Sequence, residues 1–245
     1  MKRIDDASPG ARARITGAVY LLFFASSVVS VLVPPGIGGP AGLPTDAASA
    51  ARSILANEGW YQLGVALSLI STAFYVALAV LFYALFRPVS GIAALLAAFF
   101  SLVGCAATAV GSIFELAPLT VLGGSSYLSV FSTDQLQALA LLFLNLGGES
   151  GRVALVFFGC FQLLLGYLIF RSTFLPRLIG VLIALAGVGW LAFQSPPIVN
   201  LMGGELEILG FVAEASLMLW LLVVGVNSQR WTELSSRRQS LAPGR

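Results

Sequence analysis

The chain contains no histidine and a single lysine, Lys2, and these two absences remove several classes of function. Without an imidazole there is no His-ligated haem, no His-containing zinc site and no serine–histidine or cysteine–histidine dyad. A Schiff base inside a helical bundle is excluded because Lys2 belongs to the N-terminal tail. A glycine-rich phosphate loop with its lysine is also absent. We therefore predict neither a metal nor a cofactor, and an enzyme built on this chain would depend on carboxylates, arginine or serine.

Charge is scarce as well. Only 10% of the 245 residues are charged, where globular proteins average about 25%. In contrast, 58% are hydrophobic and the mean hydropathy is +0.94. Every aspartate lies outside the apolar runs, which argues against an intramembrane aspartyl protease. The basic residues are too thinly spread to form a nucleic-acid-binding face. We therefore expect the lipid bilayer as a partner and do not expect nucleic acid.

Six apolar runs are each long enough to cross a hydrocarbon core of about 30 Å, which takes roughly 17–25 residues. They are Ile15–Val33, Trp60–Phe86, Gly91–Glu115, Arg152–Phe170, Leu178–Gln194 and Ile208–Val226. No connecting segment is long enough for a soluble domain. The sequence predicts an all-α integral membrane protein: a six-span helical bundle over residues 15–226, between tails at 1–14 and 227–245.

The basic residues fall almost entirely on one side of these spans. The two tails and the loops after the second and fourth spans hold Lys2, Arg3, Arg12, Arg14, Arg87, Arg171, Arg177, Arg230, Arg237, Arg238 and Arg245. The opposite side holds only Arg52 and Arg152. Since cytoplasmic loops carry the excess of Lys and Arg, we expect a multi-pass protein of the cell (inner) membrane with both termini cytoplasmic.

Two short helices are expected on the outer side. Thr45-Asp46 supplies a cap for an alanine-rich segment that ends near Glu58. Ser132 and Gln135 are spaced as a capping box before the apolar segment 136–144, which is too short to span. Prolines at 34–35, 118 and 196–197 are expected to mark the outer ends of the odd-numbered spans. The basic, serine-containing tail from Asn227 is expected to be disordered.

The two halves of the chain resemble each other. Tyr83-Ala84-Leu85-Phe86-Arg87 closes the second span and Tyr167-Leu168-Ile169-Phe170-Arg171 closes the fourth. One interpretation is a parallel internal repeat, a construction that transporters use. The other is that tyrosine and arginine simply belong at a cytoplasmic interface.

From Asp134 to Leu182 the sequence carries several characteristic stretches, among them Asp134-Gln135-Leu136-Gln137-Ala138-Leu139-Ala140, Val156-Phe157-Phe158-Gly159, Leu165-Gly166-Tyr167-Leu168-Ile169-Phe170-Arg171-Ser172 and Leu175-Pro176-Arg177. On these residues the chain resembles the bacterial membrane family catalogued as domain of unknown function 4386. The resemblance implies architecture and no activity. Members often have a histidine near the start of the fourth span, where this chain reads Gly147-Gly148-Glu149-Ser150-Gly151-Arg152, so no histidine-based role is implied.

Three ionisable residues lie at membrane depth: Glu115, Arg152 and Glu214. A charge near a helix centre costs about 2.5–3.5 kcal/mol on insertion scales, so such residues usually face protein or water. Each sits on a stripe of small residues spaced three, four or seven apart, and Gln162 lies on the Arg152 side of its span. Small residues let membrane helices approach closely. We therefore expect Glu115, Arg152, Glu214 and Gln162 to converge on an outward-facing ligand site.

This expected cluster has two interpretations. Arg152 either pairs with the glutamates and holds three spans together, or it lines a site where it binds a carboxylate or phosphate. In the second case burial disfavours the charged form of Glu214, which then exchanges a proton as the ligand binds. The preferred function is binding or transport of a small molecule or ion. The alternatives are a non-catalytic scaffold that binds lipid or a partner, and a carboxylate-dependent membrane enzyme.

Overall fold

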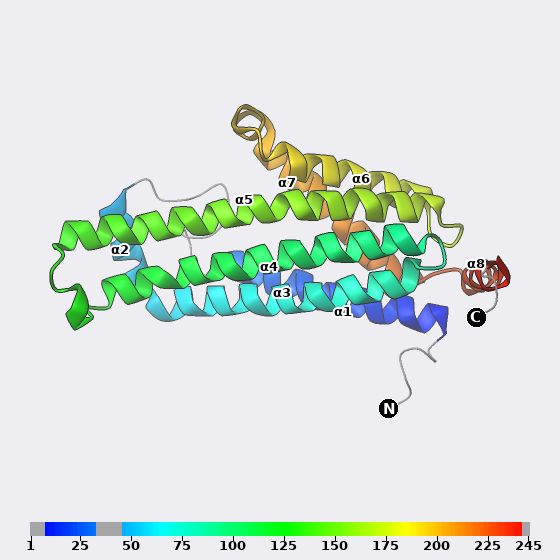
Figure 1. The fold of residues 1–245 in the computed structure, drawn as a ribbon, viewed down its shortest axis with the longest axis horizontal. Coiled ribbons are helices and arrows are strands. Elements are labelled where there is room, and N and C mark those ends of the chain that lie inside the picture. The colour runs from blue at the N-terminus through cyan, green and yellow to red at the C-terminus, as the bar shows by residue number, and fades with distance from the viewer. Residues whose placement is uncertain (1–7, 33–45, 242–245) are drawn as a thin grey trace. The chain divides into compact units, whose positions relative to one another are not determined.

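In the computed structural model, residues 8–32 and 46–241 are described, and their secondary structure is helical, with no strand in these ranges (Figure 1). The helices are α1 (Pro9–Leu32), α2 (Ala47–Ala56), α3 (Glu58–Phe86), α4 (Gly91–Leu122), α5 (Thr133–Arg171), α6 (Arg177–Ala192), α7 (Pro196–Leu219) and α8 (Ser228–Leu241), with a 3-10 turn η2 (Ser126–Leu128) and a π-helical turn η3 (Trp220–Val224).

Five helices in the described ranges are long and apolar enough to cross a membrane: Pro9–Ser30, Glu58–Phe86, Gly91–Leu122, Thr133–Arg171 and Pro196–Val224. The fifth predicted span, Leu178–Gln194, corresponds to α6, which is apolar but has 16 residues, or about 24 Å of helix. Large apolar side chains cover the outward faces of these helices. Examples are Val80, Ile113, Leu178 and Val223, each more than 60% exposed. Such surfaces suit lipid and are unusual in water.

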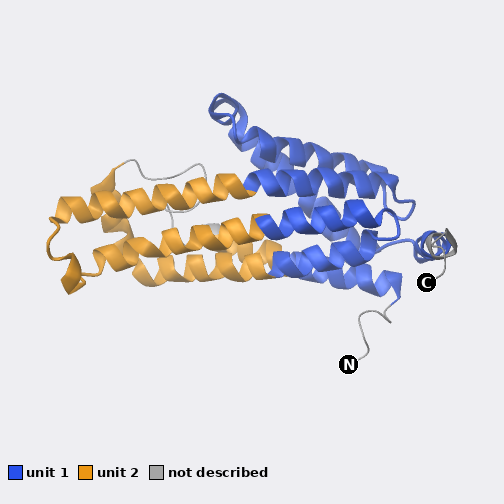
Figure 2. Ribbon diagram, in the orientation of Figure 1, with its two compact units in different colours: residues 1–21, 74–103, 155–245 blue, residues 22–73, 104–154 orange. Residues whose placement is uncertain are grey.

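The chain divides into two compact units (Figure 2). Unit 1 comprises residues 1–21, 74–103 and 155–245, and unit 2 comprises residues 22–73 and 104–154. The helices α1, α3, α4 and α5 contribute residues to both units, whereas α6, α7 and α8 belong to unit 1.

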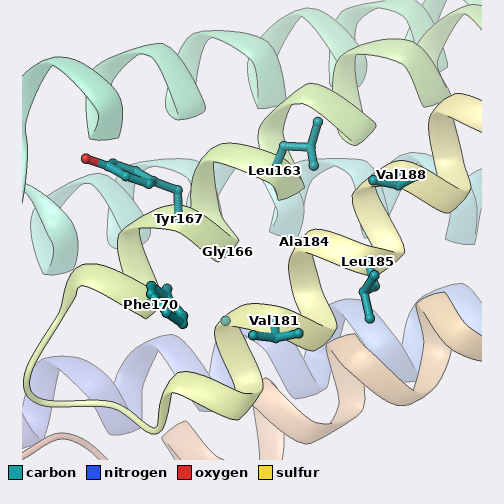
Figure 3. A pocket seen from close by; sticks show the side chains of 9 residues that line it. Leu163, Gly166, Tyr167, Phe170, Val181, Ala184, Leu185 and Val188 are labelled. Atoms are coloured by element: carbon teal, nitrogen blue, oxygen red, sulfur yellow. The ribbon is translucent and has the colours of Figure 1, made fainter.

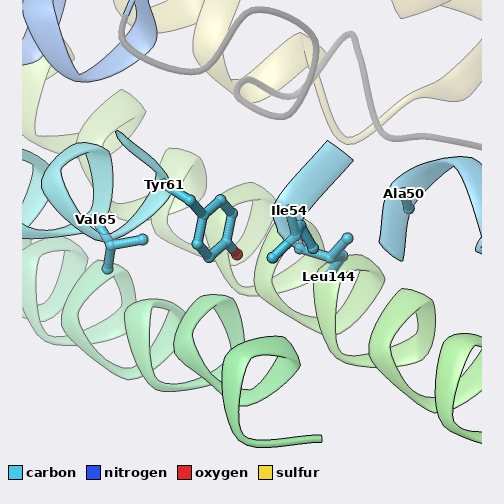
Figure 4. Close-up of a cluster of buried hydrophobic side chains, with 5 residues drawn as sticks. All are labelled: Ala50, Ile54, Tyr61, Val65 and Leu144. Atoms are coloured by element: carbon cyan, nitrogen blue, oxygen red, sulfur yellow. The ribbon is translucent and has the colours of Figure 1, made fainter. Parts of the chain in front are cut away.

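In unit 2, α2 is capped as predicted. The Asp46 side chain accepts a hydrogen bond from the Ser49 amide at 2.9 Å, and this bond lowers the pKa of the exposed Asp46 carboxyl. The helix buries Ala50 and Ile54 against Tyr61, Val65 and Leu144, as Figure 4 shows. Tyr61 is 3% exposed and its hydroxyl donates to the Glu115 carbonyl, because a buried phenol needs a partner.

The second predicted outer helix does not exist as a separate element. Its capping box is confirmed: the Ser132 amide donates to the Gln135 side chain at 2.8 Å, and the Gln135 amide donates to the Ser132 hydroxyl at 3.3 Å. From there α5 continues for 39 residues through the glycine-rich segment 147–151, where the sequence predicted a break before Arg152. Glycine costs a helix about 1 kcal/mol per residue. Contacts with α4 offset that cost, since the Ser150 hydroxyl donates to the Ala107 carbonyl at 2.8 Å and a Cβ on Gly111 would lie 3.2 Å from Ser150 Cβ.

Two further predictions are wrong: one concerns the end of α4 and the other the tail from Asn227. Pro118 lies inside α4, which ends at Leu122 and not at Glu115. A proline removes one amide from the hydrogen-bond ladder, and membrane helices tolerate this where neighbouring groups satisfy the backbone. The tail from Asn227, expected to be disordered, contains helix α8, and the Asn227 side chain accepts a hydrogen bond from the Arg230 amide at 3.1 Å. The prolines at 34–35 lie outside the described residues.

At one end of unit 1, α8 contacts the start of α1, the end of α3 and the α5–α6 loop. The Trp231 indole donates to the Leu85 carbonyl at 2.9 Å. The Arg230 guanidinium donates to the Thr173 carbonyl, also at 2.9 Å, and the Arg12 guanidinium lies 5.4 Å from the Trp231 ring centroid. Because the last carbonyls of a helix have no intrahelical partner, α8 closes the end of α3 by supplying one.

Candidate functional site

The candidate site is a polar cluster in unit 1 formed by Glu214 of α7, Gln162 of α5 and Tyr20 of α1. The Gln162 side-chain amide donates to the Glu214 carboxylate, and the Tyr20 hydroxyl forms a second hydrogen bond with the same carboxylate. Gln162 and Tyr20 are each only 1% exposed, and Glu214 is partly buried. Three helices that are distant in sequence therefore direct polar groups at one carboxylate. We call these three residues the Glu214 cluster.

Close backbone contact brings α1 together with η3, the turn that follows α7. A Cβ on Gly17 would lie 2.6 Å from the backbone nitrogen of Leu222, so only glycine fits at this contact. Tyr20 follows Gly17 by about one turn of α1, and Glu214 precedes Leu222 by about two turns. The tight contact between Gly17 and Leu222 thereby fixes the position of Tyr20 relative to the carboxylate.

The helix α6 packs along α7 and also fixes its position. The Trp190 indole lies directly against Gly210, where a side chain on α7 would collide with the ring. Gly210 and Glu214 are four residues apart and so share a face of the helix. This agrees with the expectation that Glu214 sits on a stripe of small residues at which helices pack closely.

Aromatic rings surround the Glu214 cluster. Tyr20 packs edge-on against Phe82 with ring centroids 5.8 Å apart, and Phe82 lies 6.2 Å from Phe161. Tyr75 of α3 packs against Phe161 at 5.8 Å and Phe158 at 5.1 Å. The rings provide apolar surroundings, in which hydrogen bonds to a carboxylate are stronger than in water and an unmet polar group is more costly.

One polar atom of the cluster has no hydrogen-bond partner. Gln162 uses its amide nitrogen on Glu214, while its buried amide oxygen Oε1 is unsatisfied. The Ser101 hydroxyl of α4, also in unit 1, is the second such side-chain atom among the described residues. Leaving a buried acceptor unsatisfied costs about 1–3 kcal/mol, so each case calls for an explanation.

The structure places the four predicted site residues in two groups. Gln162 and Glu214 are hydrogen-bonded to each other in unit 1. Glu115 and Arg152 belong to unit 2, where Arg152 forms an ion pair with Glu149 and the side chains of both are exposed. Glu149 and Arg152 both lie within α5. The convergence of all four residues on one site stays a prediction.

The prediction missed Tyr20 and the neighbouring Tyr75. A signal was present in the sequence: both tyrosines lie well inside apolar spans, whereas the aromatic belts of membrane proteins lie at the span ends. A phenol inside an apolar span requires a polar partner, and the Tyr20 hydroxyl is hydrogen-bonded to the Glu214 carboxylate. Among the described residues no group of three or more His, Cys, Asp or Glu side chains could hold a metal ion.

Long apolar helices, apolar outward faces and a carboxylate satisfied from neighbouring helices define this chain as a multi-helix membrane-type protein. It belongs to the family described as domain of unknown function (DUF4386), whose model matches residues 15–225. The resemblance inferred from the sequence is thereby confirmed. A comparison with curated proteins gives no significant match, and a comparison with solved structures gives none either.

Proposed function

We propose that this protein binds a proton at Glu214 and carries it across the membrane. The observation behind the proposal is the unsatisfied Oε1 of Gln162, whose amide nitrogen already bonds to the Glu214 carboxylate. A carboxylate offers only acceptors, whereas a protonated carboxyl also has an O–H donor. The cluster lacks one donor, and a proton on Glu214 would supply it.

The chemistry of the pair explains why one proton is sufficient. A protonated carboxyl and a primary amide can form two hydrogen bonds at once: the amide N–H donates to the carbonyl oxygen while the acid O–H donates to the amide oxygen. Gln162 can thus satisfy Glu214 in both protonation states without leaving its position. Tyr20 accommodates either state, because its hydroxyl both donates and accepts.

The cluster lies against aromatic rings: Tyr20 packs against Phe82, and Phe82 lies next to Phe161. Burial in such surroundings disfavours the charged carboxylate, and ionisable residues inside membrane helices commonly serve as proton relays. Among the described residues, Tyr75 also acts electrostatically on Tyr20.

For the topology we propose six spans, with α6 as the fifth of them in chain order, in the cell membrane with both termini cytoplasmic and α2 on the outer side. Support comes from the contact of Arg12 with Trp231, which joins the start of α1 to α8. An even number of spans puts the two termini on one side, and the basic residues identify that side as cytoplasmic. Alkaline phosphatase fused after Arg245 should be inactive and a fluorescent protein fused there should fluoresce; the reverse pattern would contradict this topology.

The proton proposal can be tested in proteoliposomes containing a trapped pH-sensitive dye. After an external pH jump, the lumenal pH should relax faster with the wild-type protein than in protein-free vesicles. Glu214→Gln removes the exchangeable proton but keeps the hydrogen-bonding shape, so relaxation should slow to the protein-free rate. The matched control Glu149→Gln changes an exposed carboxylate and should behave as wild type. If wild type matches empty vesicles, or if Glu214→Gln matches wild type, the proposal is wrong.

A further inference from the structure

An apolar groove of about 300 Å³ runs along the surface between α5 and α6 in unit 1 (Figure 3). Its walls are formed by Leu163, Tyr167 and Phe170 of α5 and by Val181, Leu185 and Val188 of α6. Seven residues separate the first and last wall positions on each helix, so the groove is about 10 Å long. Its volume is at the lower end of the range for ligand pockets, about 300–1,000 Å³.

Glycines on the two helices produce the groove. A Cβ on Gly166 would lie 2.6 Å from the Gly180 carbonyl oxygen and 2.8 Å from the Ala184 Cβ, so the two backbones touch with no side chain between them. Gly166, Gly180 and Ala184 form the floor, and the larger side chains on either side rise above it. The hollow is therefore a consequence of the backbone contact that holds α5 against α6.

Positive charge lies at one end of the groove. Arg177 is exposed and its guanidinium lies 5.6 Å from the centroid of the Phe170 ring, which forms the wall there. Arg171, also exposed, directly follows Phe170. The Arg177 guanidinium beside this wall, with a second exposed arginine next to Phe170 in the chain, matches a ligand with a hydrocarbon chain and an anionic head.

We propose that the α5–α6 groove binds an anionic phospholipid, with one acyl chain along the groove and the phosphate at Arg171 and Arg177. The acyl chain gains little free energy by moving from the bilayer into the groove, because lipid tails are as apolar as the groove. Selectivity must therefore come from the head group. Arginine offers a planar fork of donors that matches phosphate geometry, and a basic residue near the membrane surface contributes about 1 kcal/mol toward anionic lipid. This site is separate from Glu214 and does not depend on the proton proposal.

The experiment is a lipid titration of the purified full-length protein in detergent, followed by native mass spectrometry. Phosphatidylglycerol should bind and phosphatidylcholine should bind at least tenfold more weakly, while soluble glycerol phosphate should not bind measurably because it lacks the chain. Arg177→Gln should weaken phosphatidylglycerol binding about fivefold. Arg14→Gln, which removes an exposed arginine of α1, should change it less than twofold.

A second pair of variants tests the groove itself. Leu185→Trp places a large ring in the wall and should abolish lipid binding, whereas Leu178→Trp alters an exposed leucine of the same helix that does not line the groove and should leave binding intact. Thermal unfolding of each variant shows whether it is folded. Equal losses with Arg14→Gln and Arg177→Gln would indicate general surface attraction and overturn the proposal. Equal binding of the two lipids, binding of glycerol phosphate alone, or full binding by a folded Leu185→Trp would overturn it too.

Discussion

Gly166→Ala should destabilise the protein by about 1–3 kcal/mol, although alanine is the better helix former. The added methyl would lie 2.6 Å from the Gly180 carbonyl oxygen and 2.8 Å from the Ala184 backbone nitrogen. Both of these atoms belong to the α6 backbone and cannot rotate away. The substitution must therefore push α6 away from α5 locally, which weakens the packing between them.

Gly151→Ala is the matched control on the same helix. Nothing lies within 4 Å of the position its Cβ would take, so only helix propensity operates and the variant should be more stable by up to about 1 kcal/mol. Unfolding can be followed by the reactivity of the thiols of Cys105, which is buried, and Cys160, which is half-buried. The two substitutions should shift stability in opposite directions. A Gly166→Ala protein as stable as Gly151→Ala would show that α5 and α6 do not touch as described.

The sequence carried enough information for the class of protein and for most helix starts. Long apolar runs dictate membrane helices because backbone groups in lipid must bond within their own segment. The caps at Asp46 and Ser132 were predictable because each is a local arrangement in which a side chain bonds an amide three residues away. Family membership was predictable from residues 134–182, and the match over residues 15–225 confirms it.

The errors arise where contacts between helices outweigh local preference. The sequence predicted a short helix at 136–144 separate from the span that starts at Arg152, but close packing against α4 accompanies a continuous α5. Pro118 predicted a stop, but the loss of one backbone amide does not end α4, which continues to Leu122. The polar composition of residues 228–241 predicted disorder, and the indole of Trp231 holds α8 to the end of α3 through a bond that no local pattern encodes.

The candidate site was predictable only in part, for the same reason. Spacing along a span identifies which face carries Glu214 or Gln162, but it cannot say which face of another helix lies opposite. Tyr20 escaped prediction because its role depends on the contact between Gly17 and Leu222, residues that are far apart in the chain. The pairing of Arg152 with Glu149, three residues away on α5, is by contrast a local arrangement.

The central claim is that the carboxyl of Glu214 takes up and releases a proton while Gln162 and Tyr20 hold it. Infrared difference spectroscopy of the protein in liposomes separates the C=O stretch of a protonated carboxyl from the bands of a carboxylate. Because the acid would bond to Oε1 of Gln162, Gln162→Leu should shift the frequency of this band, and Tyr20→Phe should shift it as well. Glu115→Gln alters the other half-buried glutamate that the sequence placed in the site and should leave the band in place.

The most direct test is therefore this carboxyl band, recorded between pH 5 and 9 (about the range in which a buried carboxyl titrates) for wild type and Glu214→Gln. We expect a band that appears as the pH falls in wild type and is absent at every pH in Glu214→Gln. A band that persists in folded Glu214→Gln, or a wild-type spectrum without one, would contradict the account.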